Sequence, residues 1–235
     1  IFNNIIYMLN FDNFKEFANK NKYENNNLLK HINTQIDGRI CLTDYLHYLL
    51  SLKSYMGDQC KTYVEIGTLW GGSIISLMNL IDDYTEKFIG IDLFTGYYHK
   101  SVKKNGPNKT SQNIDETNHL EFTTNNIQKL NKYNKNFTLV KGSSYSIETV
   151  EKLKKIINSI DLLFIDGDHS EYGVTQDFLK YKDLVSKNGI IVFDNYGEPN
   201  HWEEVKKGVD KINFSDYGFE IKGQLGYSLF VEKII

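Results

Sequence analysis

The chain has 235 residues, of which 40% are hydrophobic and 14% aromatic, and its formal net charge is −3. This length suits one large domain or a domain with a small cap. Without a basic excess, neither nucleic acid nor an anionic membrane is expected as a partner. The two cysteines, Cys41 and Cys60, make no disulfide framework, which favours a reducing, cytoplasmic setting. The apolar stretch at residues 1–10 is too short to span a bilayer.

Residues 1–60 are expected to be helical. Phe11, Phe14 and Phe17 recur at helical spacing, and the segment 44–56 carries an apolar face. From residue 62 onward the pattern changes to strands that alternate with helices. We therefore expect a helical N-terminal cap over residues 1–60 and a main domain over residues 61–235.

Alternating strands and helices predict an α/β fold with a doubly wound, mostly parallel, seven-stranded sheet that is covered on both faces. Strands are expected at residues 62–66, 87–94, 137–141, 161–165 and 189–193, with a final pair at 219–222 and 227–231. Helices are expected at residues 72–81, 112–130, 146–159, 172–185 and 201–212. Ligands of such sheets bind at the carboxyl ends of the strands, and each of the first five strands ends in polar or glycine-rich sequence.

The first strand leads into a glycine-rich turn, "EIGTLWGGS" at residues 65–73. Gly67, Gly71 and Gly72 allow a tight turn and a close approach of a ligand to the backbone, although their spacing departs from the dinucleotide pattern GxGxxG. An ordinary strand-to-helix turn is the alternative. Asp92 ends the second strand, where α/β folds place an acid against ribose hydroxyls; the alternative is a helix cap or a solvated turn. Together the two features predict a cofactor that contains a nucleoside.

Acidic and amide side chains follow the fourth and fifth strands: Asp166 and Asp168 after one, Asp194 and Asn195 after the other. Neighbouring strands of a doubly wound sheet would bring these oxygens together, and oxygen ligands on rigid strand ends suit a hard divalent cation such as Mg²⁺. The alternative is local: Asp168 or Ser170 caps a helix, and the pair 194–195 forms a turn.

His169 lies beside Asp168 and is a candidate base or metal ligand, or neither. The other five histidines, His119 among them, lack acidic company and are expected to be structural or exposed. Residues 95–113 form a long polar and aromatic loop, which is either a lid over the cofactor or an ordinary surface loop. Tyr97, Tyr98 and Trp202 are candidates for stacking on a ring of the substrate, or are packing residues.

Three segments carry a resemblance to a known family: "YVEIGTLWGGSIISL", "FIGIDLF" and "LLFIDGDHSEYGVTQDFLKYKDLVSKNGIIVFDNY". They resemble the class I S-adenosylmethionine-dependent methyltransferases, and more narrowly the metal-dependent sugar O-methyltransferases of the macrocin type. The motif "DGDHSEYGV" is typical of the narrower group. The resemblance covers roughly residues 63–196 and implies a Rossmann-like methyltransferase fold.

The resemblance implies a role for each matching position. The amino-acid end of S-adenosylmethionine would be held by Glu65, Gly67 and Ser73, with Thr68 and Gly72 in the same turn. Asp92 would bind the ribose hydroxyls, and Gly142, Ser143 and Ser144 would lie near the adenine. Asp166 would lie against the cofactor and, with Asp194 and Asn195, would bind the metal. Asp168 or His169 would be the general base. The family's sugar enzymes more often show two acids where this chain has Asp194-Asn195, which puts metal affinity in question.

The implied function is O-methyl transfer to a hydroxyl of a sugar or other small polar acceptor, with S-adenosylmethionine and Mg²⁺ as cofactors. Substrate choice would reside in residues 1–60 and in the loop 95–113, and a helical N-terminal addition can mediate assembly into a homo-oligomer. The alternatives are a metal-dependent phosphoesterase, which would not need the glycine turn and Asp92 together, and a non-catalytic nucleoside-binding module. The glycine spacing and the acid cluster disfavour a nicotinamide dehydrogenase.

Overall fold

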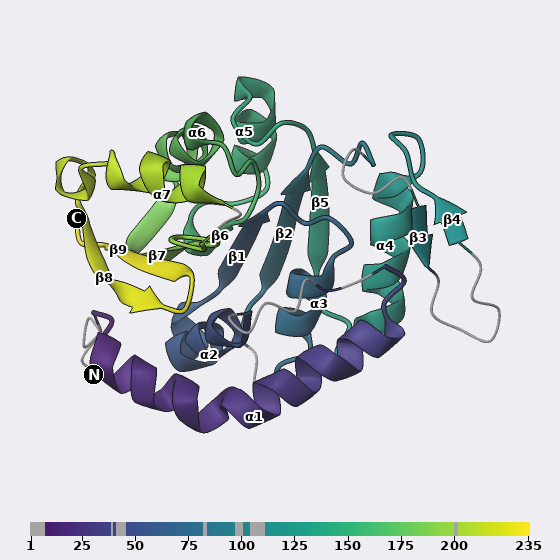
Figure 1. Ribbon diagram of the computed structural model, residues 1–235, viewed down its shortest axis with the longest axis horizontal. Helices are drawn as coiled ribbons and strands as arrows, with labels where there is room; N and C mark the ends of the chain where they lie inside the picture. Colours follow the sequence, from purple (N-terminus) through teal and green to yellow (C-terminus); the bar gives the residue numbers. More distant parts are fainter. Residues whose placement is uncertain are drawn as a thin grey trace.

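The computed structural model describes residues 8–38, 40, 46–81, 84–96, 101–103, 111–199 and 202–235. Its main feature is a seven-stranded sheet in the order β5-β2-β1-β6-β7-β9-β8 (Figure 1). The strands are β1 (Thr62–Ile66), β2 (Lys87–Asp92), β5 (Phe137–Lys141), β6 (Ile160–Ile165), β7 (Val185–Phe193), β8 (Phe219–Leu225) and β9 (Ser228–Lys233). The first five are parallel, whereas β9 runs antiparallel to both β7 and β8. The predicted doubly wound, mostly parallel sheet is confirmed.

The chain reverses its direction of winding at the centre of the sheet. From β1 it moves outward through β2 to β5, then returns to the other side of β1 with β6 and β7. This topological switch point lies between β1 and β6, and ligands of open α/β sheets bind outside the carboxyl ends of strands at such a point. The parallel register aligns Ile66 with both Ile91 and Ile165, and Ile165 with Phe193. The residues that follow these positions therefore form one rim.

Helices cover both faces of the sheet, as Figure 1 shows. One face carries α1 (Phe11–Gln35), α2 (Leu46–Met56), α3 (Gly72–Met78) and α4 (His119–Leu130). The other face carries α5 (Ile147–Lys154), α6 (Glu171–Tyr181) and α7 (Glu203–Asp210). Successive side chains of a strand point to opposite faces. Accordingly, Leu162 and Phe164 of β6 belong to the first core, and Leu163 and Ile165 belong to the second.

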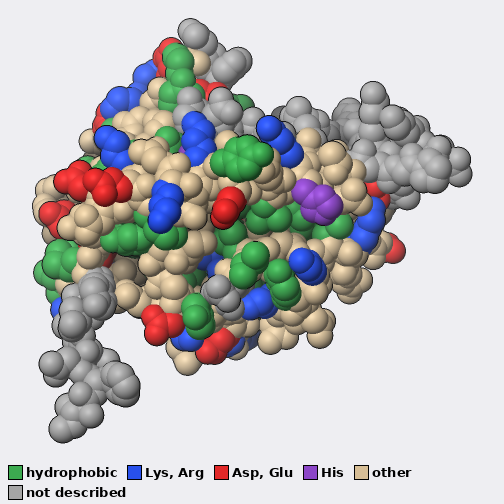
Figure 2. Space-filling view, turned by 90° about the horizontal axis from the view of Figure 1, so that it is seen from below, with side chains coloured by type: hydrophobic (Ala, Val, Ile, Leu, Met, Phe, Trp, Pro, Cys, Tyr) green, Lys and Arg blue, Asp and Glu red, His purple; other side chains and the backbone are tan. Residues whose placement is uncertain are grey.

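The two N-terminal helices share a core with α3, α4 and the sheet. α1 begins after Asn10, whose side chain accepts a hydrogen bond from the amide of Asn13. Phe14 of α1 packs against Phe230 of β9 with ring centroids 5.3 Å apart. Figure 2 views the molecule from the α1 side, where acidic, basic and apolar side chains are interspersed. In the part of the chain that the structure describes, no helix combines the length and apolar character needed to cross a membrane.

Several predicted boundaries are wrong, for local reasons. The helix expected at residues 112–130 begins only at His119, because β4 (Ser111–Asn113) pairs with β3 (Ser101–Lys103) in a small antiparallel sheet that stands beside α4 (Figure 1). The second strand ends at Asp92 rather than at residue 94, because the Asp92 carboxylate accepts the amide of Phe94, whose φ of 47° is left-handed. The helices expected at 146–159 and 172–185 are shorter, and β7 begins at Val185.

Candidate functional site

The site lies along the rim formed by the carboxyl ends of β1, β2, β5, β6 and β7. We divide it into a cofactor half, residues 65–73, 92 and 142–144, and an acid half, residues 166–169, 194 and 195. At Gly67, with φ of 92°, an added Cβ would lie 1.9 Å from the carbonyl oxygen of Asp166. Only glycine fits there, so the turn after β1 sits directly against the end of β6 and joins the two halves.

Leu69 has an unusual backbone conformation within the glycine-rich turn. Its φ of 47° lies in the left-handed region, which is unfavourable for a side chain with a Cβ. Its amide donates to Asp92 Oδ2 at 2.9 Å, and its carbonyl accepts from His119 Nε2 at 3.1 Å and from Thr123 Oγ1 at 2.7 Å. Three hydrogen bonds to side chains therefore stabilise a backbone conformation of Leu69 that would otherwise be strained.

α4 supplies two of these three bonds from one stripe of polar side chains that sequence reasoning missed. His119, Thr123 and Asn126 are spaced i, i+4 and i+7, so they share a helix face, and all three are buried. Asn126 donates to the carbonyl of Trp70 at 3.1 Å, and His119 Nδ1 accepts the amide of Gly96 at 3.0 Å. The available signal was the run "HLEFTTNN", where the inward face of a helix is polar. A polar inward face of a helix indicates that a neighbouring backbone segment needs hydrogen-bond partners.

Glu65 is a fully buried carboxyl beneath the turn. Its Oε2 accepts the hydroxyls of Tyr63 at 2.8 Å and Ser73 at 2.6 Å, and its Oε1 has no hydrogen-bond partner. Burial, together with the charge of Asp166, raises the pKa of Glu65 to about 8, although the hydroxyls of Ser73, Tyr63 and Thr68 act in the opposite direction. The structure thus brings Glu65 and Ser73 together. A buried carboxyl with one unsatisfied oxygen suits a cationic partner.

Three further predicted residues of the cofactor half, Asp92, Thr68 and Gly72, lie at the end of β2, just after β1 and at the start of α3, respectively. Asp92 accepts the amides of Leu69 and Phe94, one on each oxygen, so its predicted turn-forming role is realised; a carboxylate still has further lone pairs for hydroxyl donors. Thr68 is buried, and its side chain lies against Gly90 of β2. Gly72 packs against Ile40 of the N-terminal segment.

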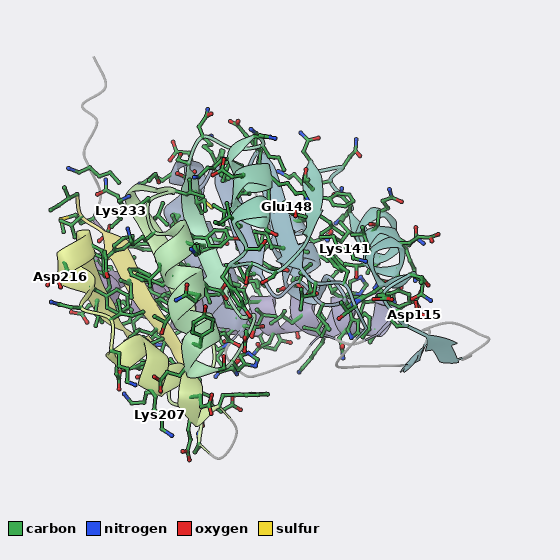
Figure 3. All side chains as sticks on the ribbon, turned by 90° about the horizontal axis from the view of Figure 1, so that it is seen from above. Asp115, Lys141, Glu148, Lys207, Asp216 and Lys233 are labelled. Atoms are coloured by element: carbon green, nitrogen blue, oxygen red, sulfur yellow. The ribbon has the colours of Figure 1, made fainter. Side chains whose placement is uncertain are left out.

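The loop after β5 completes the cofactor half. Gly142 donates its amide to the carbonyl of Asp92 at 2.9 Å, which ties the loop to the end of β2. Ser143 accepts the amide of Ser146, and the Ser144 hydroxyl donates to Asp177 of α6 at 2.5 Å. Lys141 and Glu148, labelled in Figure 3, mark the end of β5 and the start of α5 on either side of this loop.

The acid half begins with the turn after β6. His169 Nε2 lies 3.0 Å from Asp166 Oδ1, and the imidazole packs on the ring of Trp202 with centroids 4.2 Å apart. Asp168 accepts the amide of Ser170 at 3.0 Å, and the Tyr145 hydroxyl lies 3.4 Å from its other oxygen. Ser170 caps α6, as the local alternative predicted. Even so, these hydrogen bonds leave Asp168 and His169 with further capacity to bind or accept protons.

Asp194 and Asn195 follow β7, in register with the end of β6. Asp194 donates its amide to Ile165, and burial together with the charge of Asp166 holds the pKa of its carboxyl well above the ordinary value. Asn195 adopts a left-handed φ of 57°, and its side-chain nitrogen donates to Glu198 Oε2 at 2.6 Å. This bond fixes which end of the Asn195 amide is the nitrogen and which is the oxygen. The predicted metal residues are therefore neighbours at two strand ends.

The structure qualifies the metal site in one respect. Within the described ranges, no set of three histidine, cysteine or acidic side chains is grouped so that it could hold a metal ion. What remains is two carboxylates and one amide oxygen, from Asp166, Asp194 and Asn195. The stacking candidates Tyr97 and Tyr98, and residues 104–110 of the expected lid, lie outside the described residues. Trp202 is described, and 38% of its surface is exposed.

Comparisons with known proteins agree with this architecture. A family model described as a methyltransferase domain matches residues 64–196, which is more than half of the chain. Among curated proteins, "Uncharacterized protein R132" of Acanthamoeba polyphaga mimivirus is 32% identical over 204 residues, which cover 83% of this chain and 80% of that protein.

The solved structures that resemble this one include an O-methyltransferase from Bacillus cereus in complex with SAH, at 14% identity and a TM-score of 0.56, with 93% of this chain and 98% of that chain covered. The O-methyltransferase TomG from Streptomyces achromogenes, in complex with SAM, is 14% identical with a TM-score of 0.52, and 97% of this chain and 92% of that chain are covered. At such identities the likeness establishes the fold.

Proposed function

This chain belongs to the methyltransferase-domain family, and from that premise we propose that it transfers a methyl group from S-adenosylmethionine to a hydroxyl oxygen of a sugar or other small polar acceptor, assisted by a divalent cation. The observation that carries the proposal is that two acidic sites along one rim have no lysine or arginine beside them. In the part of the molecule that is described, neither Glu65 nor the carboxylates of Asp166 and Asp194 form an ion pair with lysine or arginine.

The cofactor half fits a sulfonium cofactor with an amino-acid end. When bound, S-adenosylmethionine supplies a methyl group on a positively charged sulfur. An acceptor oxygen would attack the methyl carbon in line with the carbon–sulfur bond, and the sulfur would leave as the neutral thioether of S-adenosylhomocysteine. Glu65 would hold the ammonium group through its unpartnered Oε1, since an opposite charge compensates a desolvated carboxylate. Asp92 would accept ribose hydroxyls with its remaining lone pairs, and the loop 142–144 would border the base.

The acid half fits a hard cation and a hydroxyl acceptor. A divalent cation would polarise the acceptor hydroxyl and fix its position. Asp166, Asp194 and the amide oxygen of Asn195 would hold it, because a cation between the two carboxylates would relieve the repulsion that, after burial, raises the pKa of Asp194. Asp168 or His169 would take the acceptor proton, an effect worth about 10²–10⁴-fold.

Aromatic side chains surround the acid half and favour an acceptor with a ring. Trp202 packs on His169, and Tyr145 contacts both Asp168 and the exposed Tyr172, with the two tyrosine rings 5.8 Å apart in an edge-on arrangement. Faces of aromatic rings bind the apolar faces of sugars and planar rings alike. A ring with two adjacent hydroxyls would combine this stacking with chelation of the cation.

Calorimetric titration tests the proposal. Wild-type protein, the double variant Asp166→Ala/Asp194→Ala and the control Asp216→Ala are titrated with S-adenosylhomocysteine and separately with Mg²⁺. Asp216, labelled in Figure 3, is exposed and lies in the short helical turn that precedes β8. We expect micromolar S-adenosylhomocysteine binding in all three proteins and loss of Mg²⁺ binding in the double variant alone. No binding to the wild type would overturn the proposal, and hydrolysis of p-nitrophenyl phosphate would then favour the phosphoesterase.

Methyl transfer itself is then measured with labelled S-adenosylmethionine against hydroxylated sugars and catechol, with and without a metal chelator. Transfer that is abolished by the chelator supports the cation. Transfer that persists in the chelator and in the double variant would contradict it. Cofactor binding without transfer to any acceptor would favour the non-catalytic module.

A further inference from the structure

Asp177 of α6 is a buried acid that neither half of the rim includes. Its side chain is wholly inaccessible to solvent. Oδ1 accepts the Ser144 hydroxyl at 2.5 Å, and Oδ2 has no hydrogen-bond partner. One turn later on the same helix, the Tyr181 hydroxyl donates to the Ser144 carbonyl at 2.7 Å. α6 therefore holds one residue of the loop after β5 at both its side chain and its backbone.

The other side of Asp177 faces the turn after β6. An added Cβ at Gly167 would lie 3.3 Å from Asp177 Oδ2 and 2.8 Å from the side chain of Ile66. Gly167 lies between the two acids of the motif, Asp166 and Asp168. The Asp177 carboxyl consequently fills the space between the loop of the cofactor half and the turn of the acid half.

From this placement we propose that Asp177 is a positioning residue of the methyltransferase site, which fixes the loop 142–144 relative to the turn 166–169 through the hydroxyl of Ser144. This inference rests on the proposed function, since these two segments would border the cofactor and the acceptor. Transfer between two bound groups requires that they be held in a near-attack geometry. Supporting groups that orient the contacting residues are commonly worth 10–100-fold.

The surroundings of Asp177 argue against a role in stability alone. Burial and the charge of Asp168 raise the pKa of Asp177 to about 7. The groups that face it are the Ser144 hydroxyl, the Asp168 carboxylate and the phenols of Tyr145 and Tyr181, so its described neighbours include no cation. A buried carboxyl with one unsatisfied oxygen destabilises the fold relative to an apolar residue. A geometric constraint accounts for the presence of such a group.

The test compares Asp177→Ala, Asp177→Asn, Ser144→Ala and the double variant Asp177→Ala/Ser144→Ala, with Thr175→Ala as the control. Thr175 is on the same helix, and its hydroxyl donates to Glu171 within that helix. We expect Asp177→Ala and Ser144→Ala each to weaken S-adenosylhomocysteine binding by about 10–100-fold. The double variant should be no weaker than either single variant. Asp177→Asn should stay within about threefold of the wild type, because its amide oxygen can still accept from Ser144.

Hydrogen exchange gives a second reading that does not need the cofactor. Amides of residues 142–146 should exchange faster in Asp177→Ala and in Ser144→Ala, while those of α6 and β5 stay protected. Ser144→Ala removes the same bond from a loop and serves if Asp177→Ala fails to fold. Unchanged exchange in this loop, or binding within threefold of wild type alongside a lowered melting temperature, would overturn the proposal. A wild type that binds no S-adenosylhomocysteine would overturn the function, and the exchange measurement would still decide the positioning role.

Discussion

The two halves of the rim satisfy their polar groups in opposite ways. In the cofactor half, the peptide of Leu69 has a partner for its amide and two for its carbonyl, from Asp92, His119 and Thr123. In the acid half, Asp194 is partly buried beside Asp166, and both carry the same charge when ionised. The backbone of the turn in the first half is satisfied within the protein, although the buried Glu65 keeps an oxygen without a partner. The second becomes electrostatically favourable only when a cation joins it.

This difference separates preorganisation from ligand recruitment. Because the amide and the carbonyl of Leu69 already have hydrogen-bond partners, the turn is fixed before any ligand binds, which lowers the conformational entropy lost on binding. Uncompensated carboxyls do the reverse, because they raise the free energy of the free protein and make a cation bind more tightly. Substitutions of the side chains that hold the Leu69 backbone should therefore reduce stability and affinity together. Neutralising substitutions in the second half should abolish activity while they stabilise the fold.

The largest expected effect is that of Asp194→Asn. Replacing a charged cation ligand by a neutral amide oxygen is worth several kcal/mol, so methyl transfer should fall on the order of 10³-fold. Because the folded-state pKa of Asp194 is raised, its stabilising contribution is complete below its ordinary value of 3.8 and is lost as pH rises towards the raised pKa. The variant should therefore unfold at a higher temperature than wild type at pH 7. An inactive variant that is also less stable would show that Asp194 is satisfied in the folded protein.

Glu65→Gln should produce the next largest effect. With a pKa of about 8, Glu65 is mostly protonated at pH 7 in the free protein, and a bound ammonium group would ionise it. Wild type should release up to about one proton when it binds S-adenosylhomocysteine, and Glu65→Gln should release none. Calorimetry in two buffers of different ionisation enthalpy measures this number. Equal proton release by both proteins would place the ammonium group elsewhere.

Stability in the absence of ligand provides a check on the same residue. A carboxyl whose folded pKa is raised from 4.5 to about 8 stabilises the fold fully below pH 4.5, and this contribution is lost as pH rises to 8. The decline in melting temperature between pH 5 and pH 8 should therefore be shallower in Glu65→Gln than in wild type. Asp177 and Asp194 have raised pKa values too, so part of the decline should remain.

How far the sequence could predict the site depended on what kind of signal each residue gives. Asp92, Asp166 and Asp194 were identified because each ends or directly follows a strand, and strand order follows from alternating elements, whereas Glu65 was implied by the family resemblance. Their placement on one rim is confirmed by the sheet. The roles assigned to them remain predictions, because a strand end shows where a side chain lies and not what it binds.

Asp177 and the polar stripe of α4 escaped prediction for a physical reason. Both lie in helix interiors, where a polar residue usually faces solvent, and a single sequence does not tell a buried hydroxyl from an exposed one. His119 was expected to be structural or exposed, and it is structural, but its bond to Leu69 places it directly behind the glycine-rich turn, which the sequence did not indicate. The start of α4 was wrong for a similar reason, since the pairing of β3 with β4 is a tertiary contact that local propensity does not encode.

Thr123→Val should have a moderate effect, confined to the cofactor half. The substitution preserves shape and removes one of the two donors to the Leu69 carbonyl, which costs about 1 kcal/mol in the free energy of unfolding. Affinity for S-adenosylhomocysteine should fall several-fold, because the left-handed Leu69 is less firmly held. Thr124→Val is the matched control, since Thr124 donates to Leu120 within the helix. Denaturant unfolding and calorimetry of both variants measure the difference, and equal effects would remove the special role of Thr123.

The smallest expected effect is a change in tryptophan fluorescence, which reports on both halves in one experiment. The chain has two tryptophans, and each half contains or adjoins one: Trp70 in the turn is 2% exposed, and Trp202 on His169 is 38% exposed. Acrylamide should quench Trp202 in wild type and leave little quenchable emission in Trp202→Phe. Addition of Mg²⁺ should alter the emission of wild type and not of Trp202→Phe, because the cation would bind beside His169. S-adenosylhomocysteine should alter the emission of both proteins through Trp70. A Mg²⁺ response that survives in Trp202→Phe would place the cation away from the acid half.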